Sequence, residues 1–234
     1  LSLPFGFCYY GTTYHAITPG SNSVATFSNV SEGSSCTWSY SASIPSSSLI
    51  TNAIFAAYRD ILPTSSYYNS VTGDCAIYQG IIGNYPCRSY VLSYYNVPLY
   101  SCTSTRSFTT MIVLYEGTNV IDIYIRNAPV CSSWNSGYGL IGIQNASGTE
   151  GVTPPGRNTG AWSASNEAWR FTPIGDPIYN LTWYEGDGIN GTVLGTDNTL
   201  EVCPTVDTYY TLRMQYTACN GEQFDITSTV QVVL

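Results

Sequence analysis

The sequence predicts an all-β protein with two antiparallel domains. No apolar pattern with a 3.6-residue period runs for ten residues anywhere, so we expect little helix. Short runs of alternating apolar and polar residues recur instead, as in half-buried strands. A Pro-Ile-Gly-Asp-Pro break at residues 173–177 separates two sets of such runs. We therefore predict a jelly-roll-like antiparallel β-sandwich over residues 1–173 and a small Ig-like β-sandwich over residues 174–234.

The expected strands of the first domain are rich in β-branched and aromatic residues. They are residues 1–14, 24–27, 50–58, 75–78, 88–95, 107–115, 120–126, 140–143 and 167–171. The clearest hairpin turns at residues 116–119, and three isoleucines of its second strand alternate with Asp122, Tyr124 and Arg126. One face of that strand is therefore core and the other is wet or partnered. The serine-dominated segment 28–48 is predicted to be a loop, with Trp38 packed beneath it.

The second domain has its own set of short strands. They are expected at residues 178–184, 192–194, 199–202, 208–218 and 223–234. About sixty residues of this kind are typical of a small immunoglobulin-type sandwich, and Trp183 would be its core tryptophan.

The stretch Ile141–Phe171 has strand-like ends and a long, Pro- and Gly-containing middle. A loop of this length in a compact domain normally packs on something. We expect Trp162 to plug it onto the domain body, and Arg157 and Arg170 to bind it down through carbonyl or carboxylate contacts. Trp169 is predicted to lie in the core.

Composition excludes several partner classes. Charged residues are 9% of the chain, the formal net charge is -8, and all seven basic residues are arginine. Proteins bind nucleic acids and anionic membranes through clusters of Lys and Arg, and this sequence has no such cluster. Neither is therefore an expected partner. No apolar run of about eighteen residues occurs, so no membrane insertion is predicted. The absence of a signal peptide indicates a mature product or an excised fragment.

Eight cysteines in a chain so poor in charge favour an oxidising, extracellular setting. Zinc is the rival, but there is no C-x-x-C pair and His15 is the only histidine. We therefore predict structural disulfides, although eight cysteines allow 105 pairings. Pairing of neighbours gives Cys8–Cys36, Cys75–Cys87, Cys102–Cys131 and Cys203–Cys219.

Several runs resemble a domain of large secreted surface proteins of Bacteroidota. They include PFGFCYYGTTY at residues 4–14, AIFAAYRDILP at residues 53–63 and GIQNASGTEGVTPPGRNTGAWSASNEAWRFTP at residues 142–173. Such proteins are exported by the type IX system, carry Ig-like repeats and are associated with gliding motility. The resemblance covers residues 1–173, and residues 180–234 are similar to the repeats that follow. It implies a location at the bacterial cell surface, with other modules or subunits of the same surface protein as partners.

No cofactor is predicted, with Ca²⁺ as the alternative. In the family that the chain resembles, a second acidic residue commonly stands two positions after the counterpart of Asp60, but here that position is Leu62. Ca²⁺ is coordinated by six or more oxygens, and a single carboxylate supplies few of them. Asp187, Asn190 and Asp197 form another oxygen-rich stretch, for which a polar hairpin turn is the simpler interpretation.

Catalysis finds little support in the residue pattern. A Ser-His-Asp or Cys-His site would have to use His15, and no serine lies in a G-x-S-x-G motif. A glycoside hydrolase needs two carboxylates, and Glu116, Asp122, Glu150 and Glu167 are nominal candidates. Turns, solvated strand faces and an Arg170 partner explain these four without chemistry.

Aromatic side chains are the best candidates for ligand contact, because they offer flat faces with polar tips to sugar rings. They are Tyr67, Tyr68, Tyr94, Tyr95, Trp134 and Tyr138. Core or loop packing explains about half of them equally well. We therefore expect a non-catalytic extracellular module acting in adhesion or as an assembly-forming structural component. A carbohydrate-binding module is the first alternative and a secreted glycoside hydrolase the second.

Overall fold

The computed structural model describes residues 1–31, 36–63, 76–85, 87–174, 179–217, 221 and 223–234. The chain divides into two compact units: residues 1–10 with 14–173, and residues 11–13 with 174–234. Both are built from antiparallel strands, so the predicted all-β, sandwich-type fold is confirmed.

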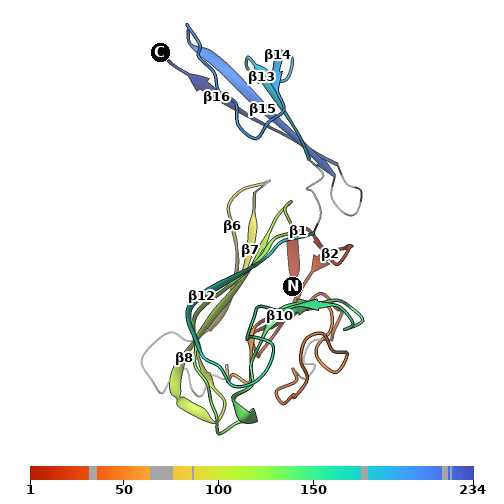
Figure 1. Ribbon diagram of the computed structural model, residues 1–234, viewed down its shortest axis with the longest axis vertical. Coiled ribbons are helices and arrows are strands. Elements are labelled where there is room, and N and C mark those ends of the chain that lie inside the picture. The colour runs from red at the N-terminus through yellow and green to blue at the C-terminus, as the bar shows by residue number, and fades with distance from the viewer. Residues whose placement is uncertain (32–35, 64–75, 86, 175–178, 218–220, 222) are drawn as a thin grey trace. The chain divides into compact units, whose positions relative to one another are not determined.

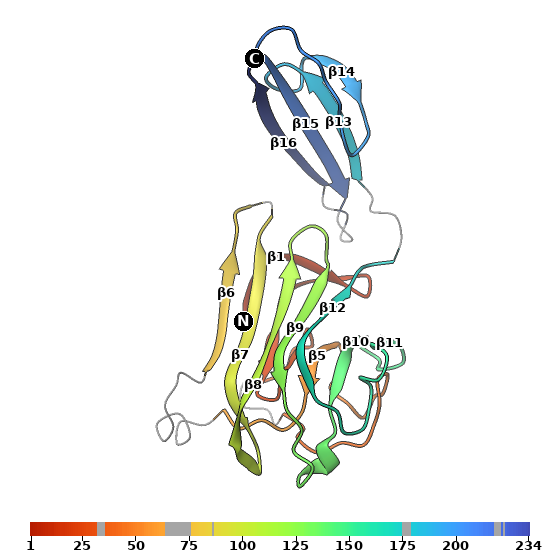
Figure 2. The ribbon, with the colours of Figure 1, turned by 60° about the vertical axis from the view of Figure 1, so that its left-hand side comes forward.

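Two five-stranded sheets form most of unit 1 (Figures 1 and 2). The first has the order β11-β10-β5-β4-β3 and the second β12-β9-β8-β7-β6, beside a two-stranded β1-β2 ribbon. The strands are β1 (Ser2–Tyr9), β2 (Thr12–Ala16), β3 (Thr18–Gly20), β4 (Val24–Thr26), β5 (Ala53–Tyr58), β6 (Ala76–Ile82), β7 (Ser89–Leu99), β8 (Cys102–Tyr115), β9 (Ile121–Ala128), β10 (Leu140–Gln144), β11 (Gly151–Val152) and β12 (Ala164–Phe171). A short 3₁₀ turn, η1 (Asn135–Gly137), follows β9.

The main core lies between these sheets, and strand periodicity explains it. In β1 every second side chain is buried, and in β9 the three isoleucines are buried as expected. Tyr124 and Arg126 on the other face of β9 are exposed. Asp122 on that face is buried, because it forms an ion pair with Arg170. The burial pattern of β9 therefore follows the period of two, with the buried Asp122 carboxylate as the exception.

Strand β5 is buried along its whole length. Ile54 and Ala56 belong to the main core, whereas Phe55 and Tyr58 belong to a second cluster that includes Tyr40. The serine-rich segment supplies Tyr40, so this loop covers the outer face of the first sheet. A strand covered on both faces is expected to be continuously apolar, as the sequence Ala-Ile-Phe-Ala-Ala-Tyr is.

The two strand-like ends of the Ile141–Phe171 stretch are strands, as predicted, but they belong to opposite sheets. β10 pairs with β5, and β12 pairs with β9. The segment between them therefore crosses from one sheet to the other. Trp169 is only half-buried and packs on the edge of the main core, so its assignment to the core interior is wrong. Its position on the terminal strand β12 leaves one side of the ring uncovered.

Unit 2 contains a single sheet, β14-β13-β15-β16, among the described residues. Its strands are β13 (Tyr179–Glu185), β14 (Thr192–Gly195), β15 (Thr208–Thr217) and β16 (Gln223–Val232). Residues 199–202 form no strand, contrary to expectation. A two-sheet Ig-like sandwich is therefore not formed by the described part of unit 2.

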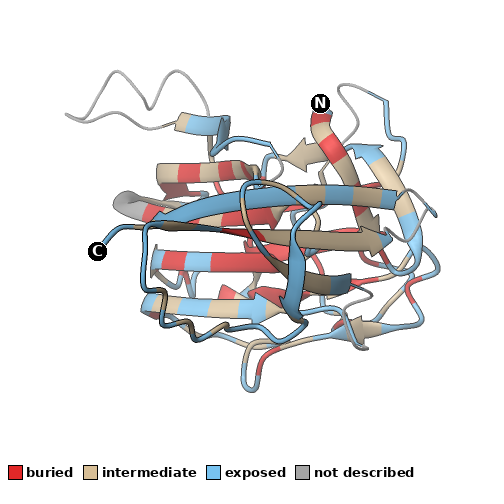
Figure 3. Ribbon diagram, turned by 90° about the horizontal axis from the view of Figure 1, so that it is seen from above, coloured by how far each residue is buried: buried red, intermediate tan, exposed pale blue. Residues whose placement is uncertain are grey.

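The sheet of unit 2 has one apolar face. Leu212 lies opposite Trp183 on β13, and Met214 lies opposite Ile226 on β16, so their side chains share that face. Few of its residues are fully buried, as the mostly tan and blue colouring of these strands shows (Figure 3). The predicted core residue Trp183 is half-buried, with its indole Nε1 donating to the Asp197 carbonyl at 2.9 Å.

The disulfide predicted between Cys102 and Cys131 is present, with Cα atoms 5.8 Å apart. Cys8 is also disulfide-bonded. Free thiols are found at Cys36, Cys87 and Cys203. The pairings Cys8–Cys36, Cys75–Cys87 and Cys203–Cys219 are therefore wrong; Cys75 and Cys219 themselves lie outside the described residues.

Cys36 shows why pairing each cysteine with its neighbour in sequence gave a wrong disulfide. Its thiol packs with the second cluster, beside Gly20, where an added Cβ would lie 3.0 Å from its Sγ. Burial raises the pKa of this thiol above its ordinary value. The Cys36 thiol is thus a half-buried packing group that Asn22, Ser21 and Tyr58 contact through hydrogen bonds.

Four buried tyrosines make stability sensitive to alkaline pH. Tyr9, Tyr40, Tyr58 and Tyr94 donate their hydroxyls to backbone carbonyls, and burial raises the pKa of each above 10. In the unfolded chain these groups lose protons near pH 10, whereas the folded state keeps them. The stability they contribute is complete below pH 10 and falls as the pH rises above it. Burial lowers the pKa of Arg59 to about 10. The contribution of Arg59 to stability therefore rises with pH above 10, opposite to that of the tyrosines.

We expect the melting temperature to stay level up to about pH 9 and to fall steeply above about pH 10, because four tyrosines outweigh one arginine. Thermal unfolding followed by circular dichroism over a pH series measures this. Tyr94→Phe should be less stable at neutral pH by about 1 to 3 kcal/mol, yet show a shallower alkaline decline. An identical decline in the variant would contradict the assignment.

Candidate binding site

Arg59 is a buried cation that organises one end of unit 1. It directly follows β5 and is only 4% exposed. Its Nη1 donates to the Pro129 carbonyl and its Nη2 to the Trp162 carbonyl at 3.1 Å, and its guanidinium lies 4.4 Å from the centre of the Trp162 ring. A Cβ at Gly139 would lie 2.3 Å from Nη2, so this position requires glycine. Arg59 therefore joins β5 to the segment after β9 and to the crossing segment.

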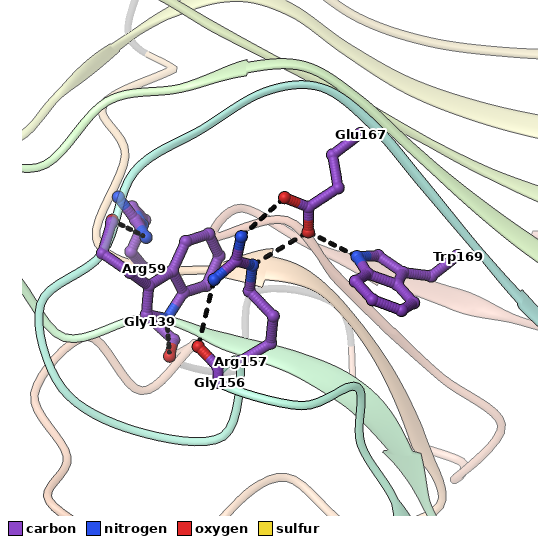
Figure 4. Close-up of polar contacts among 7 residues, drawn as sticks. Arg59, Gly139, Gly156, Arg157, Glu167 and Trp169 are labelled. Atoms are coloured by element: carbon purple, nitrogen blue, oxygen red, sulfur yellow. Dashed lines mark hydrogen bonds and ion pairs between the residues drawn. The ribbon is translucent and has the colours of Figure 1, made fainter.

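The crossing segment is held by a second arginine (Figure 4). Arg157 makes a bidentate ion pair with Glu167, with distances of 2.8 and 2.6 Å. Its guanidinium also lies 4.9 Å from the Trp162 ring centre, and the Trp162 Nε1 donates to Gly139 at 2.9 Å. Trp169 donates to the same Glu167 carboxylate. The predicted roles of Arg157 as a tie and Trp162 as a plug are therefore confirmed.

The Cys102–Cys131 disulfide fixes the segment that carries the aromatic side chains. It links the first residue of β8 to the segment that follows β9. Three residues later Trp134 begins the η1 turn, where Ser136 and Gly137 have left-handed backbone angles. A Cβ at Gly137 would lie 2.6 Å from the Val130 side chain, so a larger residue would displace the turn.

Trp134 is the centre of an exposed aromatic cluster formed with Trp38 and Tyr100. Its ring stacks on Trp38 with centroids 5.4 Å apart and an interplanar angle of 27°, and contacts Tyr100 at 4.7 Å. Its indole Nε1 donates to Asp60 Oδ2 at 2.8 Å. Trp38 is 49% and Tyr100 40% exposed, so the flanking rings present their outer faces to solvent. Four segments distant in sequence thus converge on one surface.

A small hollow of about 20 Å³ lies beside this aromatic cluster. Its lining residues are Arg59, Asp60, Leu99, Cys131, Trp134, Asn135, Gly137 and Tyr138. That volume holds a water molecule or a hydroxyl group but no larger ligand. Any ligand of sugar size must therefore lie over the hollow, on the aromatic faces, and reach into it with a polar group.

Asp60 supplies the carboxylate of the hollow. Burial raises the pKa of this carboxyl, while the bond from Trp134 lowers it. Among the described residues, Asp60 takes part in no ion pair, and its Oδ1 accepts no hydrogen bond. Asn135 lies next to it and is held by Ser39, whose hydroxyl donates to Asn135 Oδ1 at 3.4 Å. The Asn135 Nδ2 in turn donates to the Trp38 carbonyl at 3.4 Å. The hollow therefore offers the Asp60 Oδ1 acceptor beside exposed rings.

The structure brings together two of the six predicted contact aromatics. Trp134 and Tyr138 both line the hollow. Tyr94 is fully buried with its hydroxyl on two backbone carbonyls, so its role as a ligand contact is wrong. Tyr95 is half-buried on β7 and does not line the hollow, and Tyr67 and Tyr68 lie outside the described residues.

The sequence interpretation missed Trp38, Asp60 and Tyr100. Trp38 was expected to be a plug beneath its loop, but it is half-exposed because the buried Tyr40 two positions later performs that role. Tyr100 stands two positions before Cys102, as Trp134 stands three after Cys131. A predicted disulfide with an aromatic residue near each end was therefore a usable signal.

Three of the four carboxylates considered for glycoside hydrolysis are ion-paired. Arg170 holds the pKa of Asp122 below its usual value, and Arg157 does the same for Glu167. Burial tends to raise the pKa of Glu116, but its bonds to Arg88 outweigh this and lower it. A general acid needs a raised pKa, so these groups are tuned in the wrong direction. Glu150, the fourth, is exposed.

No group of three or more His, Cys, Asp or Glu side chains suited to a metal occurs in the described ranges. Asp60 instead accepts from the Trp134 indole, which occupies one of its oxygens. The prediction of no cofactor, with Ca²⁺ as its alternative, stays a prediction.

Residues 1–175, three quarters of the chain, match the model of a family described as NIDO related. The chain belongs to the NIDO-related family. No curated protein and no solved structure matches it. NIDO-related domains are typically extracellular, and an internal disulfide fits that setting, so this NIDO-related chain is an extracellular protein. Among the described residues there is no helix long and apolar enough to cross a membrane.

Removing the disulfide should loosen the aromatic cluster of this NIDO-related chain before it unfolds the sheets. The bridge closes a loop with a sequence separation of 29, which predicts a loss of roughly 3 to 4 kcal/mol in Cys102→Ser/Cys131→Ser. Urea unfolding measures the loss, and tryptophan fluorescence reports on Trp134. Unchanged stability together with unchanged fluorescence would show that the bridge does not hold the cluster. Cys87→Ser, an exposed free thiol, is the matched control and should change neither.

Proposed function

We propose that this chain is a non-catalytic extracellular module that acts in adhesion, with the Trp38–Trp134–Tyr100 aromatic cluster as its contact surface. The observation that carries the proposal is the exposure of Trp38 and Tyr100 on either side of a fixed Trp134. Exposed aromatic rings that are rigid before binding lose little conformational entropy on contact, and they supply most of the energy at many interfaces. From its resemblance to secreted Bacteroidota surface proteins, we propose the bacterial cell surface as its location.

Charge supports contact by uncharged groups. The chain has no lysine, and its four ion pairs between described residues join arginines to carboxylates of the same chain. All seven basic residues are arginine and four of them are in these pairs, so few positive charges are left for an anionic partner. Adhesion through this surface should therefore persist at high ionic strength, since uncharged contacts are not screened.

The pairing of the carboxylates is a further argument for binding over hydrolysis. Asp60 is the one carboxylate in the hollow, whereas glycoside hydrolysis requires two placed about the scissile bond. The four nominal candidates do not line the hollow. The geometry therefore supplies a surface for contact and lacks the second acid or base there.

We expect Trp38→Ala to weaken adhesion several-fold, because it removes the most exposed ring of the cluster. Beads coated with the purified protein, detached by flow from glass, mucin and polysaccharide surfaces at low and high salt, measure this. Tyr209→Ala is the matched control, since Tyr209 is 43% exposed and lies in unit 2. Equal detachment of the wild type and Trp38→Ala would contradict the proposal, as would adhesion that high salt abolishes.

Assembly is a second candidate function, favoured by strand β6. It is the terminal strand of its sheet and pairs only with β7 among the described strands. Ile77, Tyr78, Ile81 and Ile82 on it are exposed, and it carries no charge. Natural sheets normally blunt such edges with lysine or other charges, because an uncharged edge can pair with another chain. We propose that β6 pairs with β6 of a second copy.

If so, the protein should self-associate with rising concentration, and Ile82→Lys should keep it monomeric because a charge disfavours edge pairing. Sedimentation velocity over a concentration series measures this. Val206→Lys, at a position 68% exposed in a loop of unit 2, is the control and should associate like the wild type. A wild type that stays monomeric at high concentration would remove this candidate.

A further inference from the structure

We infer that the Trp38–Trp134–Tyr100 aromatic cluster and the hollow beside it form a binding subsite for an uncharged pyranose unit of a glycan. This rests on the proposed function and names the ligand class of the same site.

The aromatic surface suits the flat face of a sugar ring. Trp38 stacks on Trp134 at 27° and is 49% exposed, so the outer side of the Trp38 ring is open to a ligand. The apolar C–H face of a pyranose can lie on such a ring while its hydroxyls point outward. Tyr100, tilted by 56° against Trp134, adds a second face at an angle and a phenolic hydroxyl at the rim.

The hollow fits one polar substituent of that sugar. Its volume of about 20 Å³ takes a hydroxyl group in place of a water molecule. Asp60 Oδ1 can accept from such a group, because Trp134 occupies only Oδ2. Asn135 also lines the hollow, but its amide oxygen accepts from Ser39 and its amide nitrogen donates to the Trp38 carbonyl. An aromatic platform next to a carboxylate supplies both contacts that a sugar needs.

Charge selects an uncharged sugar. The chain carries a net charge of -8, and Asp60 adds a carboxylate within the hollow, so uronic acids, sulfated sugars and sialic acids are repelled. Arg59 cannot compensate for this repulsion, because its guanidinium is 4% exposed and bound to backbone carbonyls.

A quaternary ammonium group is the other ligand that aromatic clusters recognise, and the geometry disfavours it. Such cations are held in cages whose rings face inward from several sides. Here two of the three rings are stacked on each other, so they do not face a common centre as the rings of such a cage do.

The test is a glycan array printed with neutral gluco-, manno-, xylo- and galacto-oligosaccharides and with their acidic counterparts, followed by calorimetric titration of the best neutral hit. We expect neutral hits, with affinity kept at high salt. Trp38→Ala should weaken binding by about tenfold and Asp60→Asn by several-fold, while Tyr209→Ala should bind like the wild type. Trp38 is half-exposed, so its variant should fold, and its unfolding curve verifies this.

Lack of binding to every neutral oligosaccharide, equal binding by Trp38→Ala, or choline binding that depends on Trp38 would overturn the inference. The outcome is separable from that of the proposed function. Bead adhesion that depends on Trp38 without any glycan hit leaves adhesion standing and removes the sugar. Glycan binding without bead adhesion leaves the subsite standing and removes the adhesive role.

Discussion

Arg59 carries a positive charge into the interior of unit 1 and finds no carboxylate partner among the described residues. Burying a cation is costly unless polar groups surround it. Here backbone carbonyls bind Nη1 and Nη2 and the face of Trp162 lies against the guanidinium, while Nε has no hydrogen-bond partner among the described residues. One carbonyl belongs to Pro129, just before the segment that carries Cys131 and Trp134. The other belongs to Trp162, at the end of the segment that crosses between the two sheets. The position of both segments therefore depends on satisfying one guanidinium group.

The same use of charge recurs across the chain and explains its composition. Arg88, Arg157 and Arg170 each fork onto a carboxylate that is largely shielded from solvent. Arginine suits this task better than lysine, because its planar fork makes two parallel bonds to a carboxylate. Three of the seven arginines thus act as internal braces of unit 1, a role for which lysine is less suited.

The strands were predictable from the sequence because their patterns are local. Alternation in β9 and the turn before it follow from residues within one hairpin. The predictions that are wrong concern residues whose contacts lie in distant segments of the chain. Cys36 lies near Cys8 in sequence but packs against Gly20, and Tyr94 resembles Tyr95 in sequence but faces the core. No local pattern distinguishes such neighbours, since a shift of one residue changes the face of a strand.

The candidate site shows the same division between local and distant information. Trp134 could be found from the sequence, because it stands beside a cysteine whose pairing was predictable. Its partners Trp38 and Asp60 come from segments joined to it only through packing around β5 and Arg59. That packing has a consequence for affinity. A ring held by a hydrogen bond at one edge and a stacked neighbour on its face has little freedom left to lose, so a ligand meets a surface that is already ordered.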